Sequence, residues 1–236
     1  MLTLLLAMLL AADKPPPARL VVPKSLQKQR APLEKDQGPI PLASPATLEA
    51  LGPIDPKPGA WVEYLVHHRG KLQARVKLTV LPEAAPEGRF WLELAAASGE
   101  SLPSASRLLL KPGPFRLANV ERAMVFLMGQ APFELPIEDV AEEAPPEPKP
   151  EASVVRQGSE QIKVRAGTFR AERISVREPK TRTTVWLARG AVPLWGLVRT
   201  EGGGRVVELV EFGQSGGKSV MPDPAAAQGK GNESVK

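Results

Sequence analysis

The side chains that could carry out acid–base or metal chemistry are few in this chain and are not clustered. Its two histidines, His67 and His68, are adjacent. On a strand they would point to opposite faces, so they could not share one metal ion or one substrate. There is no third histidine to activate a serine, and no cysteine to serve as a nucleophile, a thiolate ligand or half of a disulfide. The sequence therefore predicts no catalytic residue, no metal site and no cofactor, and we expect a protein that is not an enzyme.

Glycine-rich stretches offer no phosphate-binding loop. Gly202, Gly203 and Gly204 join two strand-like segments and precede no helix, which is typical of a flexible turn. The segment 216–219 (GGKS) resembles the end of a phosphate-binding loop. It lacks the first glycine at the required spacing, a preceding strand and a following helix. We therefore discard a nucleotide-binding interpretation for both stretches.

Basic residues are concentrated in the C-terminal part of the chain. Of the formal net charge of +5, residues 153–213 carry 11 Lys and Arg against 6 Asp and Glu, which gives +5 for this part alone. Two interpretations stay open: attraction to anionic lipid headgroups or an acidic partner, and a solvated outer face of a sheet. Aromatic content of 5% with one tyrosine argues against nucleic-acid binding. The predicted basic face comprises Lys163, Arg165, Arg173, Arg177 and Arg182.

The elements that would position these residues are strands. In residues 164–212 apolar Ile174 and Val176 alternate with polar neighbours, as on a pleated sheet. Turns at 178–181 and 201–204 make two successive hairpins without a helix between them. Further strands are predicted at 59–67, 72–81, 90–97 and 106–110, and the alternation is clearest at 72–81. A parallel nucleotide-binding sheet is thereby excluded for the C-terminal half.

Two segments suggest helices. Residues 44–52 have a serine cap, a proline at the first helical position and a terminal glycine, which indicates a short helix. Residues 119–129 (NVERAMVFLMG) place apolar side chains at helical spacing and are apolar nearly all round. A buried strand is the competing interpretation, because a short apolar run has no unique period. We favour the helix, as a cover for a curved sheet.

Three segments are predicted to lie outside the folded domain. Residues 13–58 and 141–152 are rich in proline, and residues 214–236 consist mostly of small and polar residues with little to bury, which indicates a disordered tail. Residues 1–12 (MLTLLLAMLLAA) resemble the apolar core of a secretory signal and are too short to span a bilayer. We therefore expect export to the periplasm or cell envelope and one domain at 59–213, interrupted by 141–152.

Two pieces of the chain carry a family resemblance. Residues 164–173 (VRAGTFRAER), followed by Val185-Trp186 and then Pro193, resemble a strand entry and hairpin of bacterial envelope proteins related to the LolA/LolB lipoprotein carriers. The opening at 59–64 (GAWVEY) also looks like the first strand of that group. The resemblance covers residues 59–213. It implies a mainly β fold: a strongly curved antiparallel sheet forming an open half-barrel, with one or two short covering helices on its concave side.

Such folds hold acyl chains or other apolar ligands, or serve as envelope scaffolds. We expect binding of a lipid or acylated peptide, with no membrane-spanning segment but peripheral membrane contact, and no nucleic acid. Two alternatives stay open: the sheet has a filled core with no cavity, or it is a scaffold that docks a protein through its edge or basic face. The predicted apolar lining consists of Trp61, Val76, Leu78, Phe90, Leu92, Met124, Leu127, Met128, Val185 and Leu187.

Overall fold

The computed structural model describes residues 44–97, 104–127, 131–135, 152–179 and 181–221. The chain divides into two units, Met1–Pro45 and Ala46–Lys236, and nearly all the described residues belong to the second. The signal-like segment, most of the proline-rich segment 13–58, residues 141–151 and residues 222–236 lie outside the described part. No helix in the described ranges is long and apolar enough to cross a membrane.

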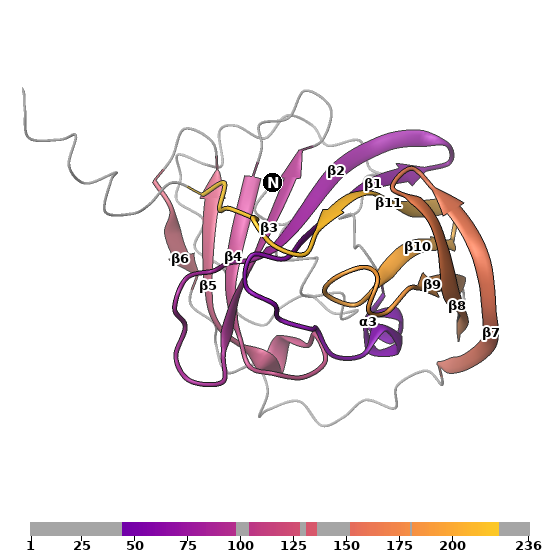
Figure 1. The fold of residues 1–236 in the computed structure, drawn as a ribbon, viewed down its shortest axis with the longest axis horizontal. Helices are drawn as coiled ribbons and strands as arrows, with labels where there is room; N and C mark the ends of the chain where they lie inside the picture. Colours follow the sequence, from indigo (N-terminus) through magenta and orange to yellow (C-terminus); the bar gives the residue numbers. More distant parts are fainter. Residues whose placement is uncertain (1–43, 98–103, 128–130, 136–151, 180, 222–236) are drawn as a thin grey trace, which may run out of the picture. The chain divides into compact units, whose positions relative to one another are not determined.

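The fold is mainly β: one antiparallel sheet of eleven strands, not closed into a barrel, with one short helix. The sheet is strongly bent, and helix α3 (Pro45–Leu51) lies within the bend (Figure 1). The strands are β1 (Trp61–His68), β2 (Lys71–Val80), β3 (Phe90–Ala97), β4 (Ser104–Leu110), β5 (Val120–Leu127), β6 (Phe133–Leu135), β7 (Ser153–Val164), β8 (Gly167–Glu178), β9 (Thr181–Leu187), β10 (Leu197–Gly202) and β11 (Arg205–Gly213). A single 3-10 turn, η1 (Leu117–Asn119), precedes β5.

The strand order is β6-β5-β4-β3-β2-β1-β11-β10-β9-β8-β7. Each strand pairs with its neighbours in sequence except at two points. The first strand pairs with the last, β1 with β11, in the middle of the sheet, with Trp61 opposite Gly213 and His68 opposite Arg205. The consecutive strands β6 and β7 form the two edges. The sequence predicted the hairpins correctly, and the long-range β1–β11 pair joins them into one sheet.

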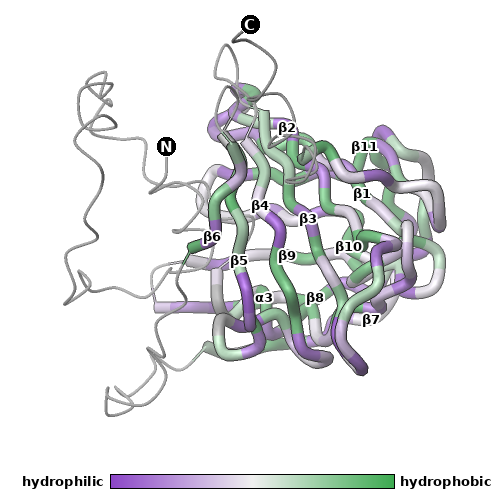
Figure 2. Tube along the Cα trace, turned by 90° about the vertical axis from the view of Figure 1, so that its left-hand side faces the viewer, coloured by the Kyte–Doolittle hydropathy of each residue, from purple (hydrophilic) through white to green (hydrophobic). Residues whose placement is uncertain are grey.

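Alternation along the strands separates two faces. The core face lies on the inside of the bend, and its side chains stand in register from strand to strand, with Val62 opposite Leu78 and Leu78 opposite Leu94. On this face Val62, Tyr64 and Val76 are at most 1% exposed. Hydrophobic and hydrophilic residues are interspersed along the strands (Figure 2). Burial of one complete face fixes the register, because a slip of one residue would turn its apolar set to water.

The prediction of a helix at 119–129 is wrong. This segment is strand β5, which pairs with β4 on one side and β6 on the other. Val125 is 1% exposed on the core face, whereas Met124 and Phe126 lie on the outer face and are half-buried. A strand that carries partly buried apolar side chains on both faces has no clear period of two. Pairing on both edges decided between two conformations that local sequence could not separate.

The predicted helix at 44–52 is confirmed as α3. Leu51, its last residue, is 2% exposed, and the carbonyl of Leu51 accepts a hydrogen bond of 2.9 Å from Arg189 Nη2. The segment after α3 is bound to the loop before β10, since Asp55 N donates to Leu194 O at 3.0 Å. One described helix therefore covers the core face together with short loops.

The segment 214–221, predicted to be the start of a disordered tail, is ordered against the sheet. Gly217 N donates to Gly59 O at 2.8 Å, and Met221 is 5% exposed. Gly217 packs so closely on Thr79 that a Cβ at this position would lie 2.7 Å from Thr79 Cγ2. The small residues that looked unable to bury surface are those that allow this close approach.

Candidate functional site

The predicted apolar lining separates into two groups. Six of its members lie on the core face, where they are at most 7% exposed: Val76, Leu78, Phe90, Leu92, Val185 and Leu187. They are not all neighbours, because four come from β2 and β3 and two from β9, on the other side of β1. Their burial shows that this part of the core face is covered by the protein itself.

Other predicted lining residues are placed elsewhere. Trp61 lies on the outer face, where Lys77 Nζ is 4.3 Å from the centroid of its ring. Met124 also lies on the outer face, opposite Arg107 and Glu134. Neither side chain joins the six on the core face. The backbone of Leu127 ends β5, its side chain is not described, and Met128 lies outside the described residues.

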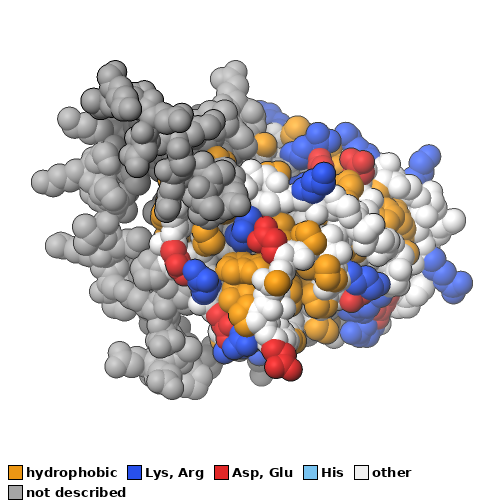
Figure 3. Space-filling view, turned by 60° about the vertical axis from the view of Figure 1, so that its left-hand side comes forward, with side chains coloured by type: hydrophobic (Ala, Val, Ile, Leu, Met, Phe, Trp, Pro, Cys, Tyr) orange, Lys and Arg blue, Asp and Glu red, His pale blue; other side chains and the backbone are white. Residues whose placement is uncertain are grey.

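The core face is partly accessible at strand β6. Phe133 stands opposite Val125, and Leu135 stands opposite Ala123. The two β5 residues are at most 5% exposed, whereas Phe133 and Leu135 are half-buried. Hydrophobic side chains also gather between charged ones on the surface shown in Figure 3. Sequence reasoning did not identify β6, because a strand of three residues carries too few positions to show a period.

A buried polar cluster occupies the outer face of β3 and β4. Glu93 is 2% exposed and stands directly opposite Arg107, whose Nη2 is 3.7 Å from Glu93 Oε2. Val220 N donates to Glu93 Oε1 at 2.8 Å, and the Ser219 hydroxyl bonds both Glu93 and Arg107. Arg107 Nη1 also donates to Glu83 Oε2 at 3.0 Å. These bonds hold residues 219–221 on the sheet.

This cluster explains two charged residues inside apolar strands. The sequence shows Glu93 within FWLELAAA and Arg107 within SASRLLL. Buried charges persist in proteins when they are paired and hydrogen-bonded. The opposite charges at facing positions of two successive predicted strands are the signal by which the pair could have been found. The carboxylate accepts two hydrogen bonds and pairs with one guanidinium, so we assign it a structural role.

The predicted basic face is divided between several places. Arg177 and Arg182 stand directly opposite each other, at the end of β8 and the start of β9. Lys163 and Arg165 are exposed at the other end of these strands, where Arg165 N donates to Glu208 Oε1 at 2.9 Å. Arg173 lies over Trp186 with 5.8 Å between guanidinium and ring, and 3.7 Å from Glu160. Of these five residues, only Arg177 and Arg182 therefore lie directly opposite each other on neighbouring strands.

The histidines end β1, where His67 and His68 are both half-buried. His68 stands between Lys71 of β2 and Arg205 of β11. Across the described part of the chain, no three His, Cys, Asp or Glu side chains come together as metal ligands. The cross-strand neighbours of His68 are therefore cationic, and those of His67 are Leu72 and Val206.

Several pKa values reflect the surroundings of individual groups. The Tyr64 hydroxyl is fully buried and donates to Leu197 O at 3.1 Å, and burial raises its pKa far above the ordinary value. The guanidinium of Arg89 lowers the pKa of Glu121, and that of Arg122 lowers the pKa of Glu134. Partial burial lowers the pKa of Arg205. The arrangement supports packing and non-covalent binding.

Comparison with known proteins finds similar folds only. No family model matches the chain, and no curated protein matches it significantly. A "putative lipoprotein" of Parabacteroides distasonis is 13% identical, with 67% of this chain and 96% of that chain covered and a TM-score of 0.37. A "putative exported protein with YmcC-like fold" of Bacteroides fragilis is 13% identical; 66% of this chain and 96% of that chain are covered, and the TM-score is 0.34. A hypothetical protein of Chlamydia trachomatis is 12% identical; 78% of this chain and 98% of that chain are covered, and the TM-score is 0.46.

None of these three is described as a LolA or LolB carrier. At such identities and TM-scores the similarity carries no argument about ligand, partner or activity. The resemblance to the LolA/LolB group therefore remains an interpretation of the sequence motifs at 59–64 and 164–198.

Proposed function

We propose that this chain is a non-enzymatic protein of the bacterial cell envelope that binds a lipid or an acylated peptide on the core face of its sheet. The observation that carries the proposal is the apolar core face of an open sheet, which continues to a half-buried edge at Phe133 and Leu135. An acyl chain at that edge would bury further apolar surface, which is favourable by about 25 cal/mol for each Å² removed from water. The signal-like residues 1–12 support the location.

The ligand seat would lie at β5 and β6 and not at the centre of the sheet. The six buried residues of the predicted lining are part of the packed core. A chain entering beside Phe133 would contact Leu135 without displacing Tyr64 or Val76, which are at most 1% exposed. Such a site needs no titratable group.

The test has two parts. Native mass spectrometry of protein purified from its host envelope should show bound lipid. The delipidated protein should bind dansyl-undecanoic acid, and Phe133→Ser should weaken this binding at least severalfold. Phe126→Ser is the matched control, because Phe126 is half-buried on the outer face of the neighbouring strand. Equal losses in the two variants, or no binding by the unaltered protein, would contradict the proposal.

A second candidate function, an assembly scaffold, is favoured by strand β7. This edge strand has twelve residues, pairs only with β8 in the described part of the sheet, and exposes Val154 and Val155 at 47% and 52%. Exposed edges accept an added strand from a partner. A stoichiometric protein partner in lipid-free complexes, lost on Val155→Pro but not on Val220→Ser, would support the scaffold over the carrier.

A further inference from the structure

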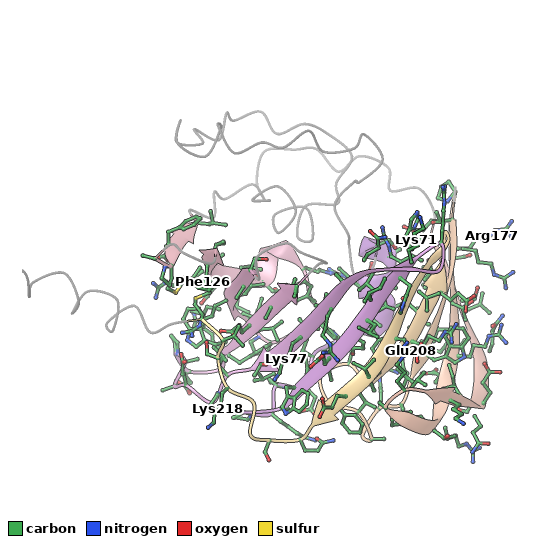
Figure 4. All side chains as sticks on the ribbon, turned by 90° about the horizontal axis from the view of Figure 1, so that it is seen from above. Lys71, Lys77, Phe126, Arg177, Glu208 and Lys218 are labelled. Carbon is green, nitrogen blue, oxygen red and sulfur yellow. The ribbon has the colours of Figure 1, made fainter. Side chains whose placement is uncertain are left out.

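Three hairpin tips lie side by side at one end of the sheet. The tips join β1 to β2, β8 to β9 and β10 to β11, and they are neighbours because β1, β11, β10, β9 and β8 are successive strands. Arg69 N donates to Gly204 O at 2.7 Å, and Gly202 stands opposite Thr183. We call residues 68–72, 177–179, 181–182 and 202–205 the hairpin rim. Lys71 and Arg177 appear at the same end of the sheet in Figure 4.

The hairpin rim carries an excess of positive charge. Four exposed cations, Arg69, Lys71, Arg177 and Arg182, form no ion pair with any carboxylate of the described residues. Arg177 and Arg182 even face each other, an arrangement that is unfavourable unless an anion lies near. Of the nearby carboxylates, Glu201 pairs with Arg199 at 3.0 Å. Glu178 lies within the rim and accepts a bond from the Thr181 hydroxyl, so it offsets one of the positive charges.

Exposed apolar side chains stand beside these cations. Among the described residues the exposed large hydrophobic side chains are Leu72, Val154, Val155 and Val220. Three of the four are at the rim end of the sheet. Leu72 is 58% exposed and follows Lys71, and Val154 is 47% exposed next to Ser153, which stands opposite Arg177. Exposed apolar groups mark contact surfaces when they recur in one place.

We propose that the hairpin rim docks on the surface of an anionic bilayer. Arg69, Lys71, Arg177 and Arg182 would contact lipid phosphates, and Leu72 would enter the boundary between headgroups and acyl chains. A bilayer interface accepts both kinds of side chain, because its headgroups are anionic and its acyl boundary is apolar. The inference does not rest on the proposed ligand site, because it uses none of the residues at β5 and β6.

The rim presents these side chains on hairpin turns that are bonded to each other. Arg69 and Gly70 both have positive φ values, 49° and 78°, as in the two-residue turns that suit the twist of a hairpin. The bond from Arg69 N to Gly204 O fixes two tips to each other. The cations therefore lie on a preformed surface, so docking requires little ordering of the chain.

The experiment is sedimentation of the full chain with vesicles of phosphatidylglycerol and phosphatidylcholine, compared with phosphatidylcholine alone. The double variant Lys71→Gln, Arg177→Gln should lower partitioning onto the anionic vesicles by about 25-fold, at about fivefold for each cation near the surface. The matched control is Lys163→Gln, Lys218→Gln. It removes the same charge from exposed lysines away from the rim, and should change partitioning less than threefold. The apolar residues 1–12 are present in every variant, so they cancel in this comparison.

A second pair of variants tests the apolar contact. Leu72→Ser should weaken binding to anionic vesicles severalfold, whereas Val220→Ser, which removes a side chain exposed to 53%, should not. Equal effects of the rim and control double variants would overturn the proposal. So would binding to neutral vesicles that is as tight as binding to anionic ones. Retention on a polyglutamate column without vesicle binding, lost in the rim double variant, would assign the rim to an acidic protein and equally overturn it.

Discussion

Replacing Glu93 by glutamine should strongly destabilise the fold, although the side chain keeps its shape. Glu93 is 2% exposed, and its carboxylate accepts bonds from Val220 N and Ser219 Oγ. The amide of glutamine removes the negative charge that faces Arg107, a side chain only 10% exposed. Arg107 would then be a buried cation with one remaining carboxylate partner, Glu83.

The size of the stability loss follows from the two carboxylate partners of Arg107. Removing one partner of a fully buried ion pair costs about 3–5 kcal/mol. Arg107 retains Glu83 at 3.0 Å, and the Glu83 side chain is 47% exposed, so part of the cation's compensation survives. We therefore expect a loss of about 2–4 kcal/mol in the free energy of unfolding. With a urea m value of about 2 kcal/mol per M, the unfolding midpoint should fall by about 1–2 M.

Urea unfolding of the full chain, followed by tryptophan fluorescence, measures this loss. Glu83→Gln is the matched control, because it removes a half-exposed carboxylate from the same guanidinium and should cost less than about 1 kcal/mol. Ser219→Ala should be coupled to Glu93→Gln, with an interaction energy of at least about 0.5 kcal/mol in a double-mutant cycle. Equal midpoints for Glu93→Gln and Glu83→Gln, or strict additivity with Ser219→Ala, would refute the reasoning.

Three further substitutions have defined outcomes. Tyr64→Phe should cost about 1–2 kcal/mol in urea unfolding, because it leaves a buried carbonyl without its donor. Arg89 lowers the folded-state pKa of Glu121, so this group stabilises the fold above its unfolded pKa and loses that contribution as pH falls through the lower, folded value. Glu121→Gln should therefore flatten the fall of Tm with pH below about 4.5; an unchanged profile would contradict this. Gly196→Ala should lower Tm more than Gly190→Ala. Both have φ near +80°, but only at Gly196 would a Cβ lie 2.8 Å from backbone atoms.

The sequence determined the local features of this fold. Apolar and polar patterning over short segments placed β2 and β3 to within one residue of their observed bounds and β1 to within two, because such patterning depends only on neighbouring residues. Turn chemistry located the hairpins at 178–181 and 201–204. Serine, proline and glycine at the ends of 44–52 identified α3. Each of these depends on interactions between residues close together in sequence.

Tertiary structure decided what depends on distant partners. Strand β5 formed because β4 and β6 pair with its two edges, and its own residues fit a helix equally well. Residues 214–221 became ordered because Glu93 and Arg107 bind them from positions more than a hundred residues away. The basic residues of the C-terminal part were visible in the sequence. The rim that places Arg177 at the same end as Lys71 exists only because β1 pairs with β11, a contact that no local pattern of residues encodes.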